Sequence, residues 1–441
     1  MARRPLLRTQ LPGPLATAVI KESEPYVSTS YTRDYPLVAA RGEGCWIIDP
    51  DGNEFLDCTA GIAVTATGHC HPEVVKVIQD QAANLIHMSG TDFYYPTQGK
   101  LAKELCQRVP VKGGNAMVYF GNSGAEANEA AIKLARWHTK RTGFLAFLNS
   151  FHGRTLGALS LTSSKARQRE RFSPLLPGVV HGIYPDPYHH GADASKIALD
   201  YVQQLFDTIA PPSDLAGIMV EPIQGEGGYV IPPDAFLIGL REICDKHGIL
   251  LMFDEVQSGM GRTGKLWACE YSGVKPDILT SAKGIASGLP LAAMFASTEV
   301  MRWPPGAHAS TFGGNPIACA AALKTLELLE RELIANSHDV GAFFQAELNR
   351  VLGNHRFVGE IRGRGLMIGL ELVKDRTSKE RFPELRNQVV QDAFLNGLLI
   401  LGCGKNTIRF CPGLTLTREE ATVVVEVFAA ALEQSIAHLK A

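Results

Sequence analysis

A lysine and an acidic pair each follow a short apolar run in the middle of the sequence. Lys283 comes just after the run at 278–280, and Asp254 and Glu255 follow the run at 249–253. A lysine amine can form a Schiff base with an aldehyde, and a carboxylate can keep a pyridine nitrogen protonated. A carboxylate next to five apolar residues also needs a cationic or hydrogen-bonding partner if it is buried. Lys283 and Asp254 together therefore indicate pyridoxal 5'-phosphate (PLP) as the cofactor.

A turn of small residues could hold the phosphate of such a cofactor. The turn at 121–126, with the sequence GNSGAE, joins an apolar run at 116–120 to a helix that we expect at 125–140. Free backbone N–H groups at a helix N-terminus and a serine hydroxyl form an anion site. Ser123 followed three residues later by Glu126 also fits a capping box, and the two roles are compatible.

Two other predicted strands end in aromatic or charged side chains. Phe151 could stack on a flat ring and Arg154 could bind a carboxylate through two hydrogen bonds, although a core phenylalanine beside a surface arginine would give the same pattern. Glu221 and Glu226 stand five positions apart after the run at 217–220. They could be a paired acid and base or solvated loop charges, and their spacing does not decide between these.

Two further motifs do not support other cofactors. The segment 259–264 matches the dinucleotide pattern GxGxxG, but no helix is predicted after it, and Asp277 precedes the next strand instead of ending it. His69 and His71 form an HxH pair without clustered acidic or thiol partners. A turn or helix-entry role is more common for such a pair, so we predict neither nicotinamide nor metal binding.

The elements that must position these residues alternate along the chain. Short, continuously apolar runs separated by helical patterns indicate a parallel sheet covered on both faces. The runs lie at 116–120, 144–148, 217–220, 249–253 and 278–280. Ligands bind beyond the carboxyl ends of the strands in such sheets. Each polar motif above falls at one of these ends, so we expect the motifs to meet at one site.

The two ends of the chain have a different pattern. From about residue 315 the sequence predicts a long helix, several strands and a final helix, as in a separate α+β domain. The predicted elements are a helix at 316–329, strands at 366–372, 398–401 and 407–411, and a helix from about 418. Near the N-terminus, Asp51 and Gly52 mark the turn of a hairpin. We predict an N-terminal arm and part of the small domain at 1–65, a large PLP-binding domain at 66–320, and a C-terminal small domain at 321–441.

Composition excludes several classes of function. The net charge of −2 and the lack of a basic stripe give no basis for binding nucleic acid. No apolar run approaches the roughly 20 residues of a membrane span, so no membrane association is expected. The nine cysteines are scattered singly, as in a reduced protein, and we expect a cytoplasmic enzyme.

Taken together, these segments resemble the class III (omega) aminotransferases of PLP fold type I, over nearly the whole chain. The resemblance is carried by GIAV at 61–64, DEVQ at 254–257, SAKG at 281–284, STFGGNP at 310–316 and IRF at 408–410. It implies an α/β large domain with a mostly parallel seven-stranded sheet covered by helices, and a small α+β domain built from both termini. It also implies a homodimer with active sites at the interface, which could pair into a tetramer.

The resemblance assigns roles in cofactor binding. Lys283 would bind the cofactor covalently and then move a proton between substrate and cofactor, and Asp254 would hold the ring nitrogen. Glu221 would support Gln257, which would contact the ring oxygen. The complete cofactor set is Ser123, Gly124, Ala125, Phe151, His152, Glu221, Asp254, Val256, Gln257, Lys283 and Thr311. In this set Phe151 and Val256 would enclose the ring, and Thr311 would come from the partner subunit.

The resemblance also implies how substrates are held. Arg409 would be neutralised by Glu226 while Arg154 binds the distal carboxylate of the amine donor, and 2-oxoglutarate would then displace Glu226 from Arg409. Ile62 and Ser310 complete the implied substrate set. Ile62 stands where ornithine aminotransferases carry a tyrosine, and an aliphatic residue suits a short apolar linker.

These roles predict ping-pong transfer of an amino group from an ω-amino acid, such as 4-aminobutyrate, to 2-oxoglutarate. Acetylornithine aminotransferases are similar in this region, including the arginine at position 154, so acetylornithine or ornithine is an alternative donor. The archaeal-type members of the 4-aminobutyrate group also include amino-acid racemases, which leaves a racemase or epimerase as a second alternative.

Overall fold

The computed structural model describes residues 3–440 and contains a seven-stranded sheet at its centre. The strand order is β4-β10-β9-β8-β7-β5-β6. The bounds are β4 (Ala116–Gly121), β5 (Gly143–Phe147), β6 (Val179–Gly182), β7 (Leu215–Val220), β8 (Leu250–Asp254), β9 (Ile278–Ser281) and β10 (Ala292–Ser297). Neighbours from β9 to β6 pair in parallel, whereas β10 is antiparallel to both β4 and β9. The predicted mostly parallel seven-stranded sheet is confirmed.

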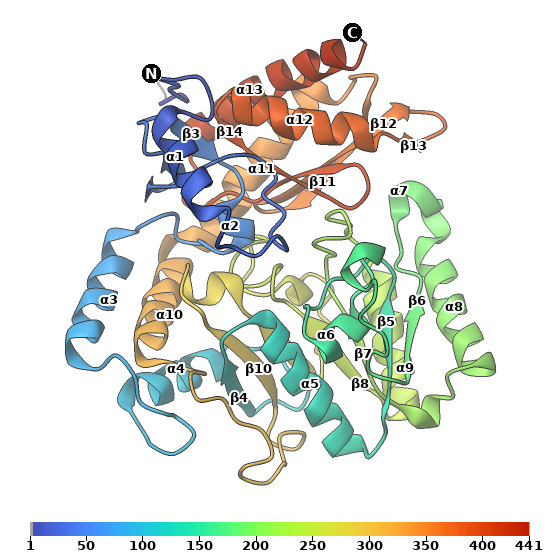
Figure 1. Ribbon diagram of the computed structural model, residues 1–441. Coiled ribbons are helices and arrows are strands. Elements are labelled where there is room, and N and C mark those ends of the chain that lie inside the picture. The colour runs from blue at the N-terminus through green and yellow to red at the C-terminus, as the bar shows by residue number, and fades with distance from the viewer. Residues whose placement is uncertain (1–2, 441) are drawn as a thin grey trace.

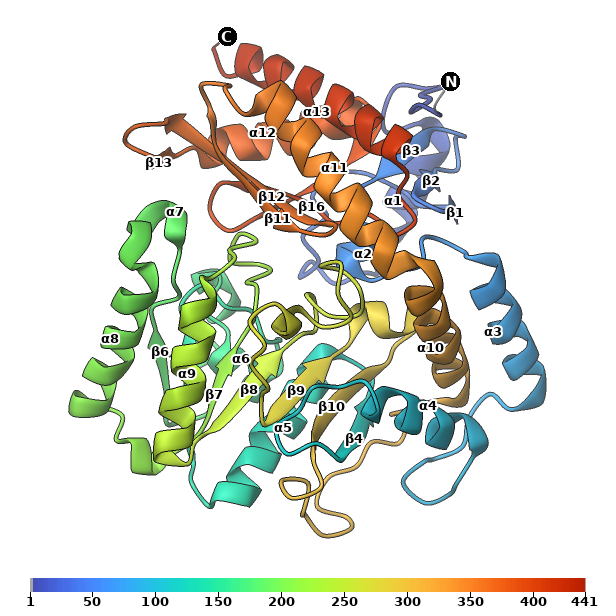
Figure 2. The same ribbon diagram turned by 180° about the vertical axis from the view of Figure 1, so that it is seen from behind.

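Helices cover both faces of this sheet. Side chains alternate between the two faces along each strand, and apolar side chains on both faces pack against helices. Phe144 and Ala146 of β5 pack with alanines of α5 (Gly124–Thr139), near α6 (Leu156–Leu161). Leu145 and Phe147 point to the opposite core, with α8 (Ala194–Thr208) and α9 (Asp234–His247). Figures 1 and 2 show these two helical layers from opposite sides.

The small domain combines both ends of the chain, as Figure 1 shows in blue and red. One of its sheets has the order β1-β2-β3-β14, and the other the order β11-β12-β16-β15 with β13 paired to β12. The strands are β1 (Arg41–Glu43), β2 (Trp46–Ile48), β3 (Glu54–Asp57), β11 (Val358–Arg364), β12 (Met367–Asp375), β13 (Glu380–Arg381), β14 (Leu398–Leu399), β15 (Leu401–Cys403) and β16 (Thr407–Phe410). Since β14 pairs in parallel with β3, the two termini share one sheet.

Three helices complete the small domain: α11 (Ile334–Leu352), α12 (Pro383–Leu395) and α13 (Arg418–His438). The hairpin predicted at Asp51 and Gly52 is confirmed by the antiparallel pairing of β2 with β3. The single strand predicted at 398–401 is wrong, because the chain passes from one sheet to the other at Ile400 and forms β14 and β15 instead. The domain boundaries at residues 65 and 320 stay a prediction.

The remaining helices connect these parts. They are α1 (Pro14–Ser23), α2 (Ala60–Ala63), α3 (Pro72–Asn84), α4 (Pro96–Cys106), α7 (Pro187–His190) and α10 (Pro316–Leu328). Short turns of helix are η1 (Ala166–Gln168), η2 (Gly191–Asp193), η3 (Pro212–Asp214), η4 (Ala268–Glu270), η5 (Lys283–Ala286) and η6 (Leu329–Leu333). The HxH pair has structural partners, since His69 lies 2.8 Å from Asp57 and His71 caps α3.

Within residues 3–440, α13 is the one helix whose length and composition would suffice to cross a membrane. It begins with a capping box between Thr417 and Glu420. Its apolar face is buried, with Val424 and Phe428 inaccessible in the core shared with α11 and α12. This packing is that of a core helix.

Candidate active site

A cavity of about 520 Å³ opens at the carboxyl edge of the large sheet. β5, β7, β8 and β9 run in the same direction because they pair in parallel. β4 runs in that direction too, because β10 lies between β4 and β9 and is antiparallel to both. Their carboxyl ends therefore meet at this edge, as the sequence predicted. The predicted residues that line the cavity are Ser123, Gly124, Ala125, Phe151, His152, Arg154, Glu221, Asp254, Val256, Gln257 and Lys283.

Lys283 lies directly beyond β9, as the first residue of η5. Its backbone has a φ of 47°, a left-handed conformation that is strained for any residue other than glycine. Burial lowers the pKa of the Lys283 amine, the neighbouring Arg409 lowers it further, and Asp254 opposes both effects. An amine with a lowered pKa is more often in the unprotonated form that attacks an aldehyde, so this environment suits covalent chemistry.

Asp254 ends β8 and is held by three hydrogen bonds. Its Oδ2 accepts from Asn128 Nδ2 at 2.8 Å and from His152 Nδ1 at 2.8 Å, and its Oδ1 accepts from the Val256 backbone N–H at 2.9 Å. Burial disfavours a charged His152, but the hydrogen bond and charge of Asp254 outweigh it and raise the His152 pKa. The carboxylate is thus fixed in orientation at the wall of the cavity.

Asn128 was not identified from the sequence, although it links three elements of the site. Besides Asp254, its Nδ2 donates to the His152 carbonyl at 2.7 Å, and its Oδ1 accepts from Thr280 Oγ1 at 2.8 Å. Asn128 is buried on the alanine-rich face of α5, between Ala127 and Ala130. A polar residue on an otherwise apolar helix face was the available signal.

The N-terminus of α5 forms the predicted small-residue turn. Ser123 Oγ accepts from the Glu126 backbone N–H at 3.3 Å, so the capping role is present. At Gly124 an added Cβ would lie 2.7 Å from Val256 Cγ1, a distance that real Cβ atoms do not reach. The backbone of α5 therefore approaches Val256 as closely as a glycine allows.

Gly124→Ala is expected to weaken PLP binding about 10-fold, because overpacking costs of order 1–3 kcal/mol and the displaced Val256 would intrude on the ring position. The measurement is a titration of the cofactor-free protein with PLP. Gly99→Ala on α4 is the matched control, since nothing lies within 4 Å of its added Cβ. Equal PLP affinity of the two variants would contradict this role for Gly124.

Glu221 does not support Gln257 as expected. Its carboxylate accepts from the backbone N–H groups of Phe151 at 3.2 Å and Gly225 at 3.0 Å. Gln257 is held instead by Tyr229, whose hydroxyl donates to Gln257 Oε1 at 2.8 Å. Burial raises the pKa of Glu221 to about 7, although the nearby His152 opposes the shift. The expected contact is absent because the Glu221 carboxylate is taken up by the backbone after β5 and by Gly225, while Gln257 meets Tyr229.

Arg409 in β16 faces Glu226 across the domain boundary. Arg409 Nη1 lies 3.3 Å from Glu226 Oε1, and Lys165 Nζ lies 3.8 Å from Glu226 Oε2. Burial opposes the charged Glu226, but Arg409 and Lys165 lower its pKa below the ordinary value. Arg409 is 4% exposed, and its Nε and Nη1 donate no hydrogen bond within the described residues. Buried guanidinium donors without a hydrogen bond suit an incoming carboxylate.

Five predicted residues do not line this cavity: Glu226 and Arg409, which pair beside it, and Ile62, Ser310 and Thr311. Ile62 is 42% exposed in α2, and Thr311 is exposed. Ser310 accepts a hydrogen bond at 3.2 Å from Asn122, which does line the cavity. Val64 and the segment 288–291 also line the cavity but were not predicted from the sequence. The segment was missed because β10, whose amino end brings it to this edge, was not predicted.

The residues present fit PLP. An amine and a buried carboxylate face one cavity, Phe151 and Val256 line it, and a helix N-terminus with close backbone approach at Gly124 can receive a phosphate. His152 Nε2 is buried there without a hydrogen-bond partner among the described residues. Such an orphaned group is consistent with a site shaped for a bound molecule.

Comparison with known proteins agrees with this geometry. The class III aminotransferase family matches residues 27–432. An acetylornithine aminotransferase of Methanosarcina mazei is 41% identical over 93% of this chain and 95% of its own. An alanine/serine racemase of Pyrococcus horikoshii is 36% identical over 98% of this chain and 93% of its own. The crystal structure of an (S)-enantioselective omega-transaminase from Thermomicrobium roseum superimposes with a TM-score of 0.88, at 33% identity, over 96% of this chain and 99% of its own.

The amine, the carboxylate and the helix N-terminus at one sheet edge, together with relatives that match over almost the full length, lead to one conclusion. The chain is a PLP-dependent transaminase and belongs to the class III aminotransferases.

Proposed function

We propose that the enzyme moves an amino group from an ω-amino acid, such as 4-aminobutyrate, to 2-oxoglutarate in two half-reactions. The observation that supports this most is the buried pair of Arg409 and Glu226 beside the cavity. A second cation, Arg154, lines the cavity and is exposed. This set can receive a substrate with one carboxylate or with two.

Charge balance explains why both residues are needed. A donor with one carboxylate uses Arg154, and Glu226 keeps Arg409 neutralised meanwhile, since an unpaired buried arginine is costly. A 2-oxo diacid brings a second carboxylate for Arg409, and Glu226 then turns away. Lys165, 3.8 Å from Glu226 Oε2, lies where it can balance the displaced charge.

When bound, PLP supplies an aldehyde that exchanges amino groups and a ring that accepts electrons. Lys283 Nζ would hold the cofactor and would carry the proton that leaves the substrate carbon. Asp254 would hold the ring nitrogen and keep it protonated, while Phe151 and Val256 would exclude water from the ring. A homodimer in the cytoplasm is part of this proposal, with Thr311 contributed by the partner subunit.

Acetylornithine or ornithine is the alternative donor, which the 41% identity to an acetylornithine aminotransferase favours. A screen of amines for conversion of bound cofactor to its amine form tests the choice. We expect 4-aminobutyrate to react faster than N-acetylornithine, ornithine and leucine. A preference for N-acetylornithine would overturn the donor assignment and keep the enzyme class.

A racemase is the second candidate, because the relatives include the racemase above and an isoleucine 2-epimerase of Lentilactobacillus buchneri, which is 36% identical over 92% of this chain. Racemisation needs no oxo acid. Incorporation of solvent deuterium at the α-carbon with inversion, in the absence of an oxo acid, would favour this candidate over amino transfer.

Glu226→Gln tests the charge balance directly. The neutral amide leaves Arg409 uncompensated, so kcat/KM of the amine half-reaction is expected to fall at least about 10-fold. The half-reaction with 2-oxoglutarate, which displaces Glu226, should change by less than about 3-fold. Single-turnover kinetics of each half-reaction measure the two values. Equal losses in both would argue against the proposed switch.

A further inference from the structure

The loop that carries Glu226 is rich in glycine, and hydrogen bonds such as that from the Gln224 N–H to the Val230 carbonyl at 3.1 Å close its base. Between Glu221 and Val230 it contains Gly225, Gly227 and Gly228, and glycine has more backbone freedom than any other residue. The loop nevertheless presents two side chains to the site: Glu226 to Arg409, and Tyr229 to Gln257. Contacts from outside the loop add to its own hydrogen bonds.

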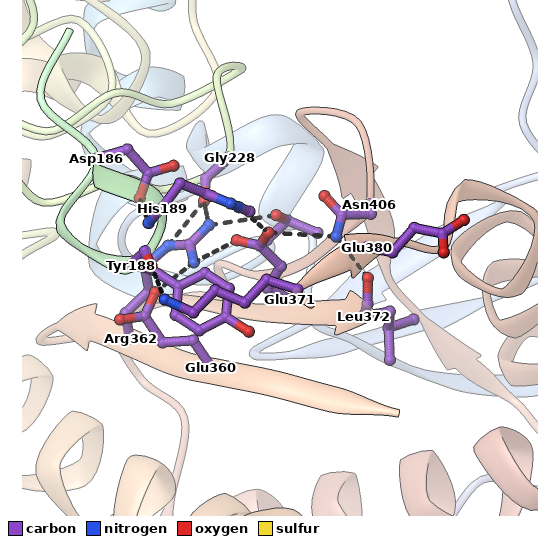
Figure 3. A network of polar contacts seen from close by, with 12 residues as sticks. Asp186, Tyr188, His189, Gly228, Glu360, Arg362, Glu371, Leu372, Glu380 and Asn406 are labelled. Carbon is purple, nitrogen blue, oxygen red and sulfur yellow. Dashed lines mark hydrogen bonds and ion pairs between the residues drawn. The ribbon is translucent and has the colours of Figure 1, made fainter. Parts of the chain in front are cut away.

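The outside contacts to residues 226–229 include several from the small domain, chiefly from Arg362 in β11. Arg362 Nη2 donates to the Gly228 carbonyl at 2.6 Å, and its Nε donates to the Tyr229 carbonyl at 3.1 Å. The Gly404 backbone N–H also donates to the Glu226 carbonyl at 2.6 Å. Figure 3 shows Arg362 beside Gly228.

Arg362 is itself fixed by two carboxylates. Its Nη1 lies 2.6 Å from Glu360 and 2.7 Å from Glu371. Burial opposes the charge on Arg362, but Glu371 and Glu360 raise its pKa above the ordinary value. The other oxygen of Glu371 lies 2.7 Å from His189 Nε2, at the end of α7 in the large domain. The network in Figure 3 thus joins the two domains behind the loop.

We propose that Arg362 is a positioning residue that holds the loop 225–230 so that Glu226 faces Arg409, and thereby helps set the balance between one-carboxylate and two-carboxylate substrates. This inference rests on the proposed role of Glu226. All three guanidinium nitrogens of Arg362 have partners, and a lysine offers a single nitrogen that cannot reproduce this fork.

The test compares Arg362→Lys with Lys379→Met. Lys379 contacts the Tyr188 carbonyl at 2.6 Å and also joins the two domains, but it does not touch the loop. Arg362→Lys is expected to lower kcat/KM of the amine half-reaction about 10-fold and that of the 2-oxoglutarate half-reaction less than about 3-fold. Lys379→Met should leave the ratio of the two constants unchanged.

A double variant separates this inference from the proposed function. If Arg362 acts through Glu226, the effects of Arg362→Lys and Glu226→Gln on that ratio will not add. Additive effects, an unchanged ratio in Arg362→Lys, or equal losses in both half-reactions would overturn the inference. An unchanged ratio in Glu226→Gln alone would instead overturn the proposed switch. Should Arg362→Lys fail to fold, Glu371→Gln takes its place with the same expected direction.

Discussion

Replacing Lys283 by alanine is expected to lower the rate of amino transfer at least about 10⁴-fold, because one substitution removes both the nucleophile and the proton carrier. The fold should survive, since alanine adds no bulk at a position whose side chain faces the cavity. Alanine shares the unfavourable left-handed backbone of Lys283, so the strain there is not newly introduced.

The measurement combines kinetics with mass spectrometry. Borohydride treatment should leave the cofactor attached to the unaltered protein and not to Lys283→Ala. Lys275→Ala is the control, since Lys275 is exposed in the same part of the chain and lines no part of the cavity. A Lys283→Ala protein that keeps a borohydride-fixed cofactor would show that another amine holds it.

The cofactor site could be predicted from the sequence because its parts are local. Each residue follows an apolar strand directly, and parallel strands bring their carboxyl ends to one edge. Ser123, Asp254 and Lys283 therefore meet whatever the details of packing. Asn128 was missed because it lies one turn into helix α5 and not directly after a strand.

The substrate region and the domain interface depend on contacts that no local pattern encodes. Glu226 and Arg409 were paired by family resemblance alone, since they lie 183 positions apart (409 − 226) and meet only when the small domain packs on the large one. The same holds for His189, Arg362 and Glu371. Strand β10, with its sequence AAMFAS, was missed because alanine and serine give weak strand signals.

Replacing Asp254 by asparagine is expected to lower the rate of the amine half-reaction by about 10²- to 10⁴-fold. Asparagine keeps the size of the side chain but has no negative charge to balance a protonated ring nitrogen. It also offers a single acceptor oxygen where Asp254 now accepts from Val256, Asn128 and His152. An NH₂ group would then face at least one of these donors, and the side chain would lose its fixed orientation.

The adjacent Glu255 provides a matched control, because it is also buried and also accepts three hydrogen bonds. These come from the Ser258 hydroxyl at 2.9 Å and from the backbone N–H groups of Ala268 and Cys269, each at 2.8 Å, and Glu255 does not line the cavity. Glu255→Gln should lower the Tm and leave the rate per bound cofactor within about 3-fold of the original. Asp254→Asn should instead cause a large loss of rate per bound cofactor, at nearly full occupancy in excess PLP. If both substitutions only destabilised the fold, the charge next to the ring would have no part in catalysis, and the assignment of Asp254 would fail.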